Sequence, residues 1–140
     1  MITVVVDANV FVSAVLSPAG TPAQVLNAWR DGRFVLVLST AILAEIYRVL
    51  HSPKIAMRHQ WSEAQIRTFV DALASQAVLT SGDLILTVIT DDPADNRYLA
   101  CAVEGAGDFL VSGDQLLLNL GAYQGITILT PRAFLDILQA

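Results

Sequence analysis

Cysteine and histidine are scarce in this sequence of 140 residues, which contains one cysteine and two histidines. A single cysteine, Cys101, cannot form an intrachain disulfide and cannot supply a cysteine-based zinc site. We therefore expect a reducing, cytoplasmic location. Cys101 itself is interpreted as a small buried hydrophobic residue.

Charged residues are also few, at 15% of the chain against 54% hydrophobic residues. At this length the composition predicts one domain over residues 1–140, with a large core and an apolar surface left for a partner. The uncharged stretch from Ala8 to Trp29 is long enough to suggest a membrane span. The turn-forming segment 17–22 interrupts it, and no basic segment precedes it, so we expect neither a transmembrane helix nor a signal peptide.

The net charge of −5 does not favour nucleic-acid binding, because affinity for phosphates usually needs a basic surface. Charge is nevertheless sorted along the chain. Nine of the thirteen acids lie from Asp71 onward, whereas six of the eight basic residues fall between positions 30 and 67: Arg30, Arg33, Arg48, Lys54, Arg58 and Arg67. This distribution leaves room for one basic face and one acidic pocket.

Apolar periodicity predicts strands that alternate with helices. The expected strands are 2–6, 34–38, 109–112 and 126–129, with at least one more at 78–79 or 84–89. The expected helices are 10–16, 21–30 with Thr21 as N-cap, one from 39 or 40 to about 52, one from 61–63 onward, 93–104, a turn or short helix at 116–118, and one from 131. This alternation with short connections predicts an α/β fold, a three-layer α/β/α sandwich with a mostly parallel sheet.

Two acids follow predicted strands. Asp7 comes directly after the β-branched run 2–6, where an ionised carboxylate is costly to bury unless a partner compensates it. Asp114 comes just after the strand at 109–112. Because chemistry in parallel α/β sheets gathers where the strands end, we expect Asp7 and Asp114 to share the carboxyl edge. Asp108 lies at the opposite end of its strand, so we leave it out of the predicted site.

Two predicted helices each add one carboxylate. Glu45 lies three residues after Ile42 and four before Val49, within an apolar stripe, and Asp95 lies four residues before Leu99 on a core-like face. Four ionised carboxylates in one core repel one another, and this repulsion destabilises the fold unless a cation compensates their charge. Mg²⁺ or Mn²⁺ would fit, because these ions bind carboxylate oxygens and leave positions open for a substrate phosphate.

Local structural roles are an alternative for every acid of this group except Glu45. They are an N-cap at Asp92 with Asp95 in the first turn, an N-cap at Asp114, and an Asx turn formed by Asp7 and Asn9. Residue spacing alone leaves these roles and a metal site both open.

The order of the motifs resembles that of PIN-domain proteins. The motifs are Val5-Val6-Asp7-Ala8-Asn9-Val10, Ser39 to Leu50 around Glu45, Asp92-Pro93-Ala94-Asp95-Asn96, and Leu110-Val111-Ser112-Gly113-Asp114. They span essentially the whole chain. The sequence is most similar to the VapC-like branch, the toxin nucleases of toxin–antitoxin pairs.

This resemblance implies a Mg²⁺- or Mn²⁺-dependent endoribonuclease with a cognate antitoxin and a homodimeric state. The family's catalytic, metal-binding quartet corresponds to Asp7, Glu45, Asp95 and Asp114, and its supporting polar positions to Asn9, Ser112 and Asn96. Attack by a metal-activated water would leave 5′-phosphate and 3′-hydroxyl ends.

Basic side chains near the predicted site are candidates for binding RNA. We assign this role to Arg48, Lys54 and Arg58, although basic residues on helices often only solvate a surface. His51 and His59 are interpreted as exposed polar residues rather than catalytic bases.

Two other classes of function stay open at this point. One is a non-catalytic RNA- or protein-binding module of the same fold. The other is a phosphoaspartyl receiver or phosphatase-like domain, which is disfavoured because Asp7-Ala8-Asn9 lacks a second acid and the single lysine, Lys54, does not follow a late strand.

Overall fold

A computed structural model describes all residues from 1 to 140 and contains a six-stranded sheet. The strand order is β3-β2-β1-β4-β6-β5, and all neighbouring strands are parallel except β5 and β6. The strands are β1 (Thr3–Val6), β2 (Val35–Leu38), β3 (Val78–Leu79), β4 (Phe109–Val111), β5 (Ala122–Tyr123) and β6 (Ile126–Leu129). The predicted mostly parallel sheet is confirmed.

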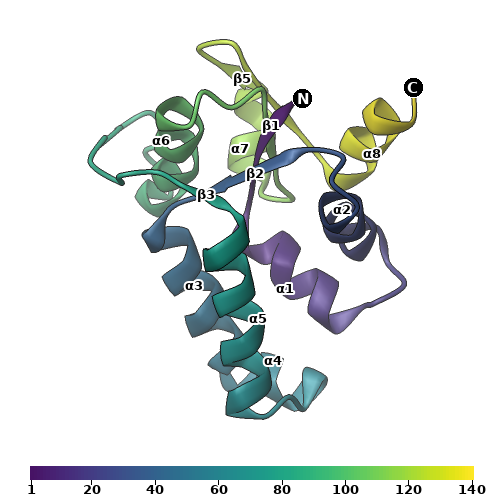
Figure 1. Cartoon of the computed structure of the whole chain (residues 1–140). Helices are drawn as coiled ribbons and strands as arrows, with labels where there is room; N and C mark the ends of the chain where they lie inside the picture. The colour runs from purple at the N-terminus through teal and green to yellow at the C-terminus, as the bar shows by residue number, and fades with distance from the viewer.

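Helices cover both faces of this sheet and complete the three-layer α/β/α sandwich. In Figure 1, α6 lies on one side of β1, and α2 with α8 lies on the other. The helices are α1 (Ala8–Leu16), α2 (Thr21–Arg30), α3 (Thr40–His51), α4 (Pro53–His59), α5 (Glu63–Gln76), the 3₁₀ turn η1 (Pro93–Asp95), α6 (Asn96–Glu104), α7 (Gln115–Leu120) and α8 (Pro131–Gln139). None of them combines the length and the apolar character needed to cross a membrane.

Helix α6 packs on β1, β2 and β4 and forms part of the core. Val4, Val5 and Val6 are almost completely buried, as expected for β-branched residues of a central strand. Gly105 at the end of α6 allows a close approach to β2, because a Cβ atom there would lie 2.5 Å from Cγ1 of Val37. Cys101 is buried in the same layer, as predicted.

Polar residues at the carboxyl edge of the sheet begin the following helices. Asp7 follows β1 and caps α1, and Ser39 follows β2 and caps α3 by accepting a hydrogen bond from the Ile42 amide at 3.3 Å. Thr130 follows β6 and caps α8. Because these are side-chain N-caps, the strand-to-helix turns hold their polar groups at one edge.

Several predicted boundaries and elements differ in the structure. Thr21 lies inside α2, whose N-cap is Gly20. Pro53 begins the additional helix α4, since a proline that cannot continue one helix suits the first turn of the next. Of the two candidates, 78–79 is a strand and 84–89 is not. The predicted helix 93–104 begins as a 3₁₀ turn, and the short antiparallel strand β5 was not predicted.

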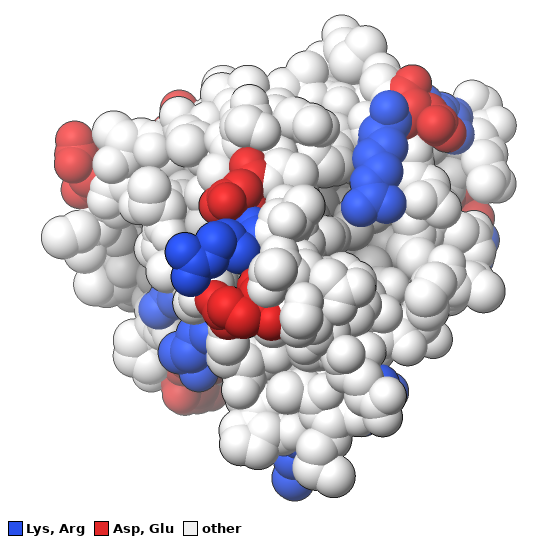
Figure 2. Space-filling model, turned by 60° about the horizontal axis from the view of Figure 1, so that its bottom comes forward, with Lys and Arg blue, Asp and Glu red and all other residues white.

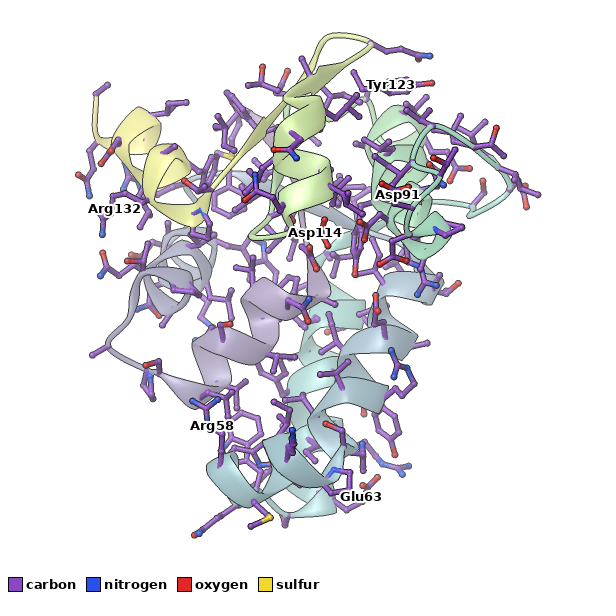
Figure 3. The ribbon with its side chains drawn as sticks, turned by 180° about the vertical axis from the view of Figure 1, so that it is seen from behind. Arg58, Glu63, Asp91, Asp114, Tyr123 and Arg132 are labelled. Atoms are coloured by element: carbon purple, nitrogen blue, oxygen red, sulfur yellow. The ribbon has the colours of Figure 1, made fainter.

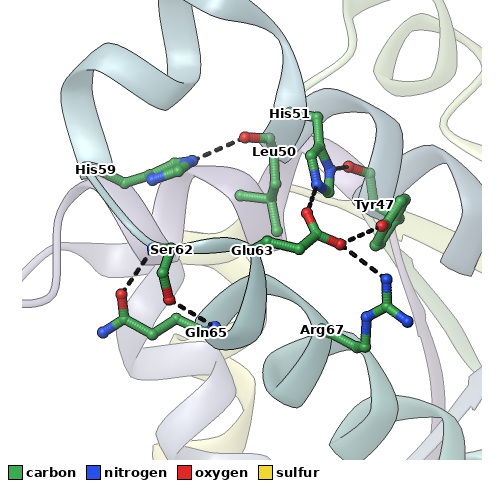
Figure 4. Close-up of polar contacts among 8 residues, drawn as sticks. All are labelled: Tyr47, Leu50, His51, His59, Ser62, Glu63, Gln65 and Arg67. Atoms are coloured by element: carbon green, nitrogen blue, oxygen red, sulfur yellow. Dashed lines mark hydrogen bonds and ion pairs between the residues drawn. The ribbon is translucent and has the colours of Figure 1, made fainter.

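A charged cluster joins α3 to α5 (Figure 4). The carboxylate of Glu63 accepts hydrogen bonds from Tyr47 and, at 3.0 Å, from Arg67, and it contacts Nε2 of His51. The His51 contact is the main reason why the pKa of Glu63 falls to about 2. Both ring nitrogens of His51 face acceptors, which favours the imidazolium and raises the pKa of this side chain.

His59 has a structural role of its own. Its Nε2 atom lies 2.8 Å from the carbonyl oxygen of Leu50, and its Nδ1 accepts a hydrogen bond from the Trp61 amide at 2.8 Å. The ring therefore ties the end of α4 to α3, and it is half-buried rather than exposed as the sequence suggested.

Candidate metal centre

Asp7 lies at the junction of β1 and α1 with only 2% of its surface exposed. Its backbone amide donates to the carbonyl of Val111 at 2.9 Å, which fixes the residue beside β4. One carboxylate oxygen, Oδ1, accepts from the amide of Asn9 at 3.0 Å, and Oδ2 accepts from the hydroxyl of Ser112 at 2.7 Å. Burial raises the pKa of Asp7, and these hydrogen bonds oppose that shift.

Ser112 connects two of the predicted acids. The side chain is fully buried, and its Oγ also accepts a hydrogen bond from the backbone amide of Asp114 at 2.9 Å. Asp114 caps α7, because its Oδ1 accepts from the amides of Leu116 and Leu117 at 2.9 and 3.2 Å. Figure 3 shows Asp114 at the start of this helix. The carboxyl ends of β1 and β4 are therefore joined through one hydroxyl.

Asp95 is the least satisfied of the acids. Only 6% of the residue is exposed, as the sequence predicted, and its Oδ2 atom is buried without a hydrogen-bond partner. Loss of water and the neighbouring carboxylate of Asp114 raise the pKa of Asp95 to about 7, with smaller contributions from Asp92 and Asp7. A buried carboxylate beside other carboxylates is stable only if it is protonated or if a cation compensates it.

Three carboxylates converge on one point. Asp92, Asp95 and Asp114 each offer one oxygen, and these atoms lie within 4.8 Å of one another. None of the ion pairs in the molecule involves these three side chains. An all-oxygen set without a counter-charge, including one buried oxygen without a partner, fits a hard divalent cation such as Mg²⁺ or Mn²⁺.

Glu45 lies outside this converging group and is held by basic and phenolic partners. Its Oε2 accepts from the hydroxyl of Tyr98 and from Arg97 at 3.4 Å, while its Oε1 accepts from Arg48 at 3.5 Å. The side chain is 21% exposed, so it lies at the border of the buried face rather than in the core. The charge of Glu45 contributes to the raised pKa of Asp7.

The comparisons with known proteins decide the family. The family model described as the PIN domain matches residues 3–116. The chain belongs to the PIN-domain family. An uncharacterized protein of Methanocaldococcus jannaschii, MJ1680, is 31% identical over 119 residues, which are 85% of this chain and 75% of that protein. PIN domains are generally metal-dependent nucleases, and the metals that they use are typically divalent.

Three polar residues, Asn9, Ser112 and Asn96, were predicted to support the site of this PIN domain, and they form different hydrogen bonds. Ser112 contacts two of the acids, whereas the exposed Asn9 contributes its backbone amide. Asn96 is buried and holds the loop before η1. Its Oδ1 accepts from the amides of Val88 and Ile89 at 2.9 and 2.8 Å, and its Nδ2 donates to the carbonyls of Ile89 and Pro93.

The basic residues predicted to bind RNA do not form one group. Arg48 pairs with Glu45, whereas Lys54 and Arg58 are exposed on α4 and make no ion pair. Figure 3 places Arg58 far from Asp114. On the face shown in Figure 2, Lys and Arg side chains are interspersed with Asp and Glu rather than gathered in one basic surface.

Sequence reasoning missed three residues of this centre. Asp92 was treated only as a helix cap, a role it does have because its Oδ1 accepts from the amide of Ala94 at 3.3 Å. Arg97 and Tyr98 contact Glu45 from α6. Their positions directly after Asp95 and Asn96 gave the only sequence signal, because the contact joins residues more than fifty positions apart.

Proposed function

We propose that this PIN domain is an endoribonuclease that depends on Mg²⁺ or Mn²⁺ and cleaves RNA phosphodiester bonds. The observation that carries the proposal is the buried Asp95 carboxylate, whose Oδ2 has no protein partner and which lies beside Asp114. Membership of a family of metal-dependent nucleases supports the same reaction class. The activity of residues 1–140 as one nuclease domain is part of this proposal.

We assign the metal-holding and catalytic role to Asp7, Glu45, Asp95 and Asp114. A bound divalent cation would activate water for in-line attack on phosphorus and would neutralise charge on the phosphate oxygens. Asp95 and Asp114 supply carboxylate oxygens to this position from η1 and from the start of α7. Asp7 supports it from β1, and Glu45 from α3.

Side-chain donors hold the carboxylates of Asp7 and Glu45 in place. Ser112 donates to Asp7 and accepts from the amide of Asp114, so one hydroxyl orients the ends of β1 and β4. Tyr98 and Arg97 orient Glu45 in the same way. Burial and the charges of Asp7 and Glu45 raise the pKa of Tyr98, so the phenol stays protonated and acts as a donor.

RNA contacts are assigned to Arg48, Lys54 and Arg58. Arg48 lies next to Glu45, so it is placed to meet a phosphate near the scissile bond. Lys54 and Arg58 are exposed on α4 and are free of carboxylate partners, which suits contacts to a longer substrate.

The proposed biological role is that of the toxin in a toxin–antitoxin pair, acting in the cytoplasm as a homodimer. The support is the resemblance of the ordered motifs to the VapC-like branch, together with an apolar pocket between α1, α2 and α5 that includes Trp61 and Phe69. Copurification with the product of a small adjacent reading frame would support this role, and the absence of such a partner would contradict it.

The experiment that tests the nuclease is RNA cleavage by protein stripped of metal with EDTA, before and after Mg²⁺ or Mn²⁺ is restored. We expect cleavage only after metal is restored, and none by Asp95→Asn. Asp136→Asn is the matched control, because Asp136 is an exposed acid of α8 that pairs with Arg132. Cleavage by Asp95→Asn at the wild-type rate would contradict the proposal.

A further inference from the structure

Asp92 has a second oxygen that its helix-capping role does not use. The cap at the start of η1 uses Oδ1, which accepts from the amide of Ala94 at 3.3 Å, and no protein donor reaches Oδ2. Asp114 shows the same division, because Oδ1 alone accepts from the amides that begin α7. In both residues one oxygen orients the carboxylate and the other stays available.

The acids around the centre therefore fall into two groups. Asp92, Asp95 and Asp114 each keep an oxygen without a protein donor, and these are the three residues whose carboxylates converge within 4.8 Å. Asp7 and Glu45 have protein donors on both oxygens. Among these five acids, the three that keep an oxygen without a protein donor are thus the three that converge.

Asp95 supplies an independent reason to expect a ligand at this point. Its residue is more than nine-tenths buried, and its Oδ2 has no hydrogen-bond partner. Arg97, two residues further along the chain, pairs with Glu45 instead. A buried carboxylate close to two others, with no basic side chain paired to any of them, is stabilised by a cation that all three can reach.

We infer that Asp92 is a direct ligand of the divalent cation, in addition to capping η1, and that it binds the same ion as Asp95 and Asp114. This inference rests on the proposed function. The turn η1 then presents two ligands, Asp92 and Asp95, from one 3₁₀ segment, and α7 presents the third. Asp92 is exposed, so it closes the solvent side of the position that Asp95 closes from the core.

The test is direct Mn²⁺ binding, measured by titration calorimetry and by electron paramagnetic resonance of free Mn²⁺, with no RNA present. The variant is Asp92→Asn, because asparagine can still cap η1 through its carbonyl oxygen. Asp91→Asn is the matched control: Asp91 is an adjacent exposed acid outside the converging group, and its variant makes the same change in net charge. Circular dichroism in EDTA verifies that both variants are folded.

We expect Asp92→Asn to weaken Mn²⁺ binding by roughly tenfold or more, since it removes one charged ligand, and Asp91→Asn to bind nearly as the wild type does. Equal affinity of wild type and Asp92→Asn would overturn the inference and leave the proposed nuclease intact. Equal weakening in both variants would also overturn it, because the effect would then be one of net charge. Absence of binding to the wild type would overturn the proposed function itself.

Discussion

The hydroxyl of Ser112 donates a hydrogen bond to Oδ2 of Asp7 at 2.7 Å. The two residues are 105 positions apart, and the bond joins the ends of two neighbouring parallel strands at the edge where the acids gather. Because Ser112 is fully buried, this contact is a part of the core as well as of the proposed site.

Replacement of Ser112 by alanine should therefore reduce both stability and activity. The variant leaves Oδ2 of Asp7 and the amide of Asp114 without their partner, which we expect to lower the free energy of unfolding by about 1–3 kcal/mol. Ser112→Thr keeps the hydroxyl and should retain more of both properties. Urea denaturation and RNA cleavage measure the two effects. Equal losses in the alanine and threonine variants would show that the hydroxyl is not the cause.

Asp95 should make the metal-free protein less stable as the pH rises. Its pKa in the folded state is about 7 against an ordinary value of 3.8, so between these values the folded state holds a proton that the unfolded state has lost. Stability in EDTA should fall from about pH 4 to about pH 7 and then level off. Asp95→Asn should remove this fall of the free energy of unfolding with pH. At pH 8 the variant should be more stable than the wild type by on the order of 2 kcal/mol.

Thermal denaturation in EDTA over this range of pH measures the effect. Addition of Mg²⁺ should raise the midpoint of the wild type more than that of Asp95→Asn, because a ligand that binds only the folded state stabilises it. An Asp95→Asn profile parallel to that of the wild type would contradict this account of the carboxylate.

Asn96 should control the order of the loop before η1. Asn96→Ala removes all four hydrogen bonds to Val88, Ile89 and Pro93, so the amides of Val88 and Ile89 should exchange with solvent deuterium much faster. We expect a loss of about 2 kcal/mol in the free energy of unfolding. Asn119→Ala is the control, since Asn119 is exposed and bonds only Gln115. Unchanged exchange at both amides would refute the role of Asn96.

Gly105 should be intolerant of any side chain. Gly105→Ala places a Cβ atom 2.5 Å from Cγ1 of Val37, so α6 must shift away from β2, at a cost of about 1–3 kcal/mol. Gly107→Ala is the matched control, because the nearest atom to its Cβ would be 3.4 Å away. Urea denaturation of both variants measures the difference. Equal stability of the two would contradict the close packing of α6 on β2.

The fold could be predicted well because its signals are local. The β-branched run before Asp7 indicates a buried strand. The N-cap residue Ser39 indicates the start of a helix directly after the next strand. The segment 84–89 could not be predicted, since its apolar residues suggest a strand, whereas the amides of Val88 and Ile89 donate to the side chain of Asn96, eight and seven positions along the chain. The helix α4 was missed because Pro53 was taken only as the end of α3.

The site could be predicted only in part. Sequence spacing identified Asp95 as buried, and the structure brings it together with Asp114. It did not identify Asp92 as a member of the converging group, because an acid before a proline is already explained by capping. It also missed the contact of Tyr98 with Glu45, which depends on how α6 packs beside α3 and so has no local signal.

The most direct test of the account is the chemistry of the cleavage products. A panel of structured RNAs is incubated with Mg²⁺ or Mn²⁺ and with wild type, Asp7→Asn or Glu45→Gln, and the ends of the products are identified. We predict metal-dependent cuts with 5′-phosphate and 3′-hydroxyl ends for the wild type, and their loss in both variants. Cyclic phosphate ends, or cleavage that persists in both variants, would contradict the proposed carboxylate-metal nuclease.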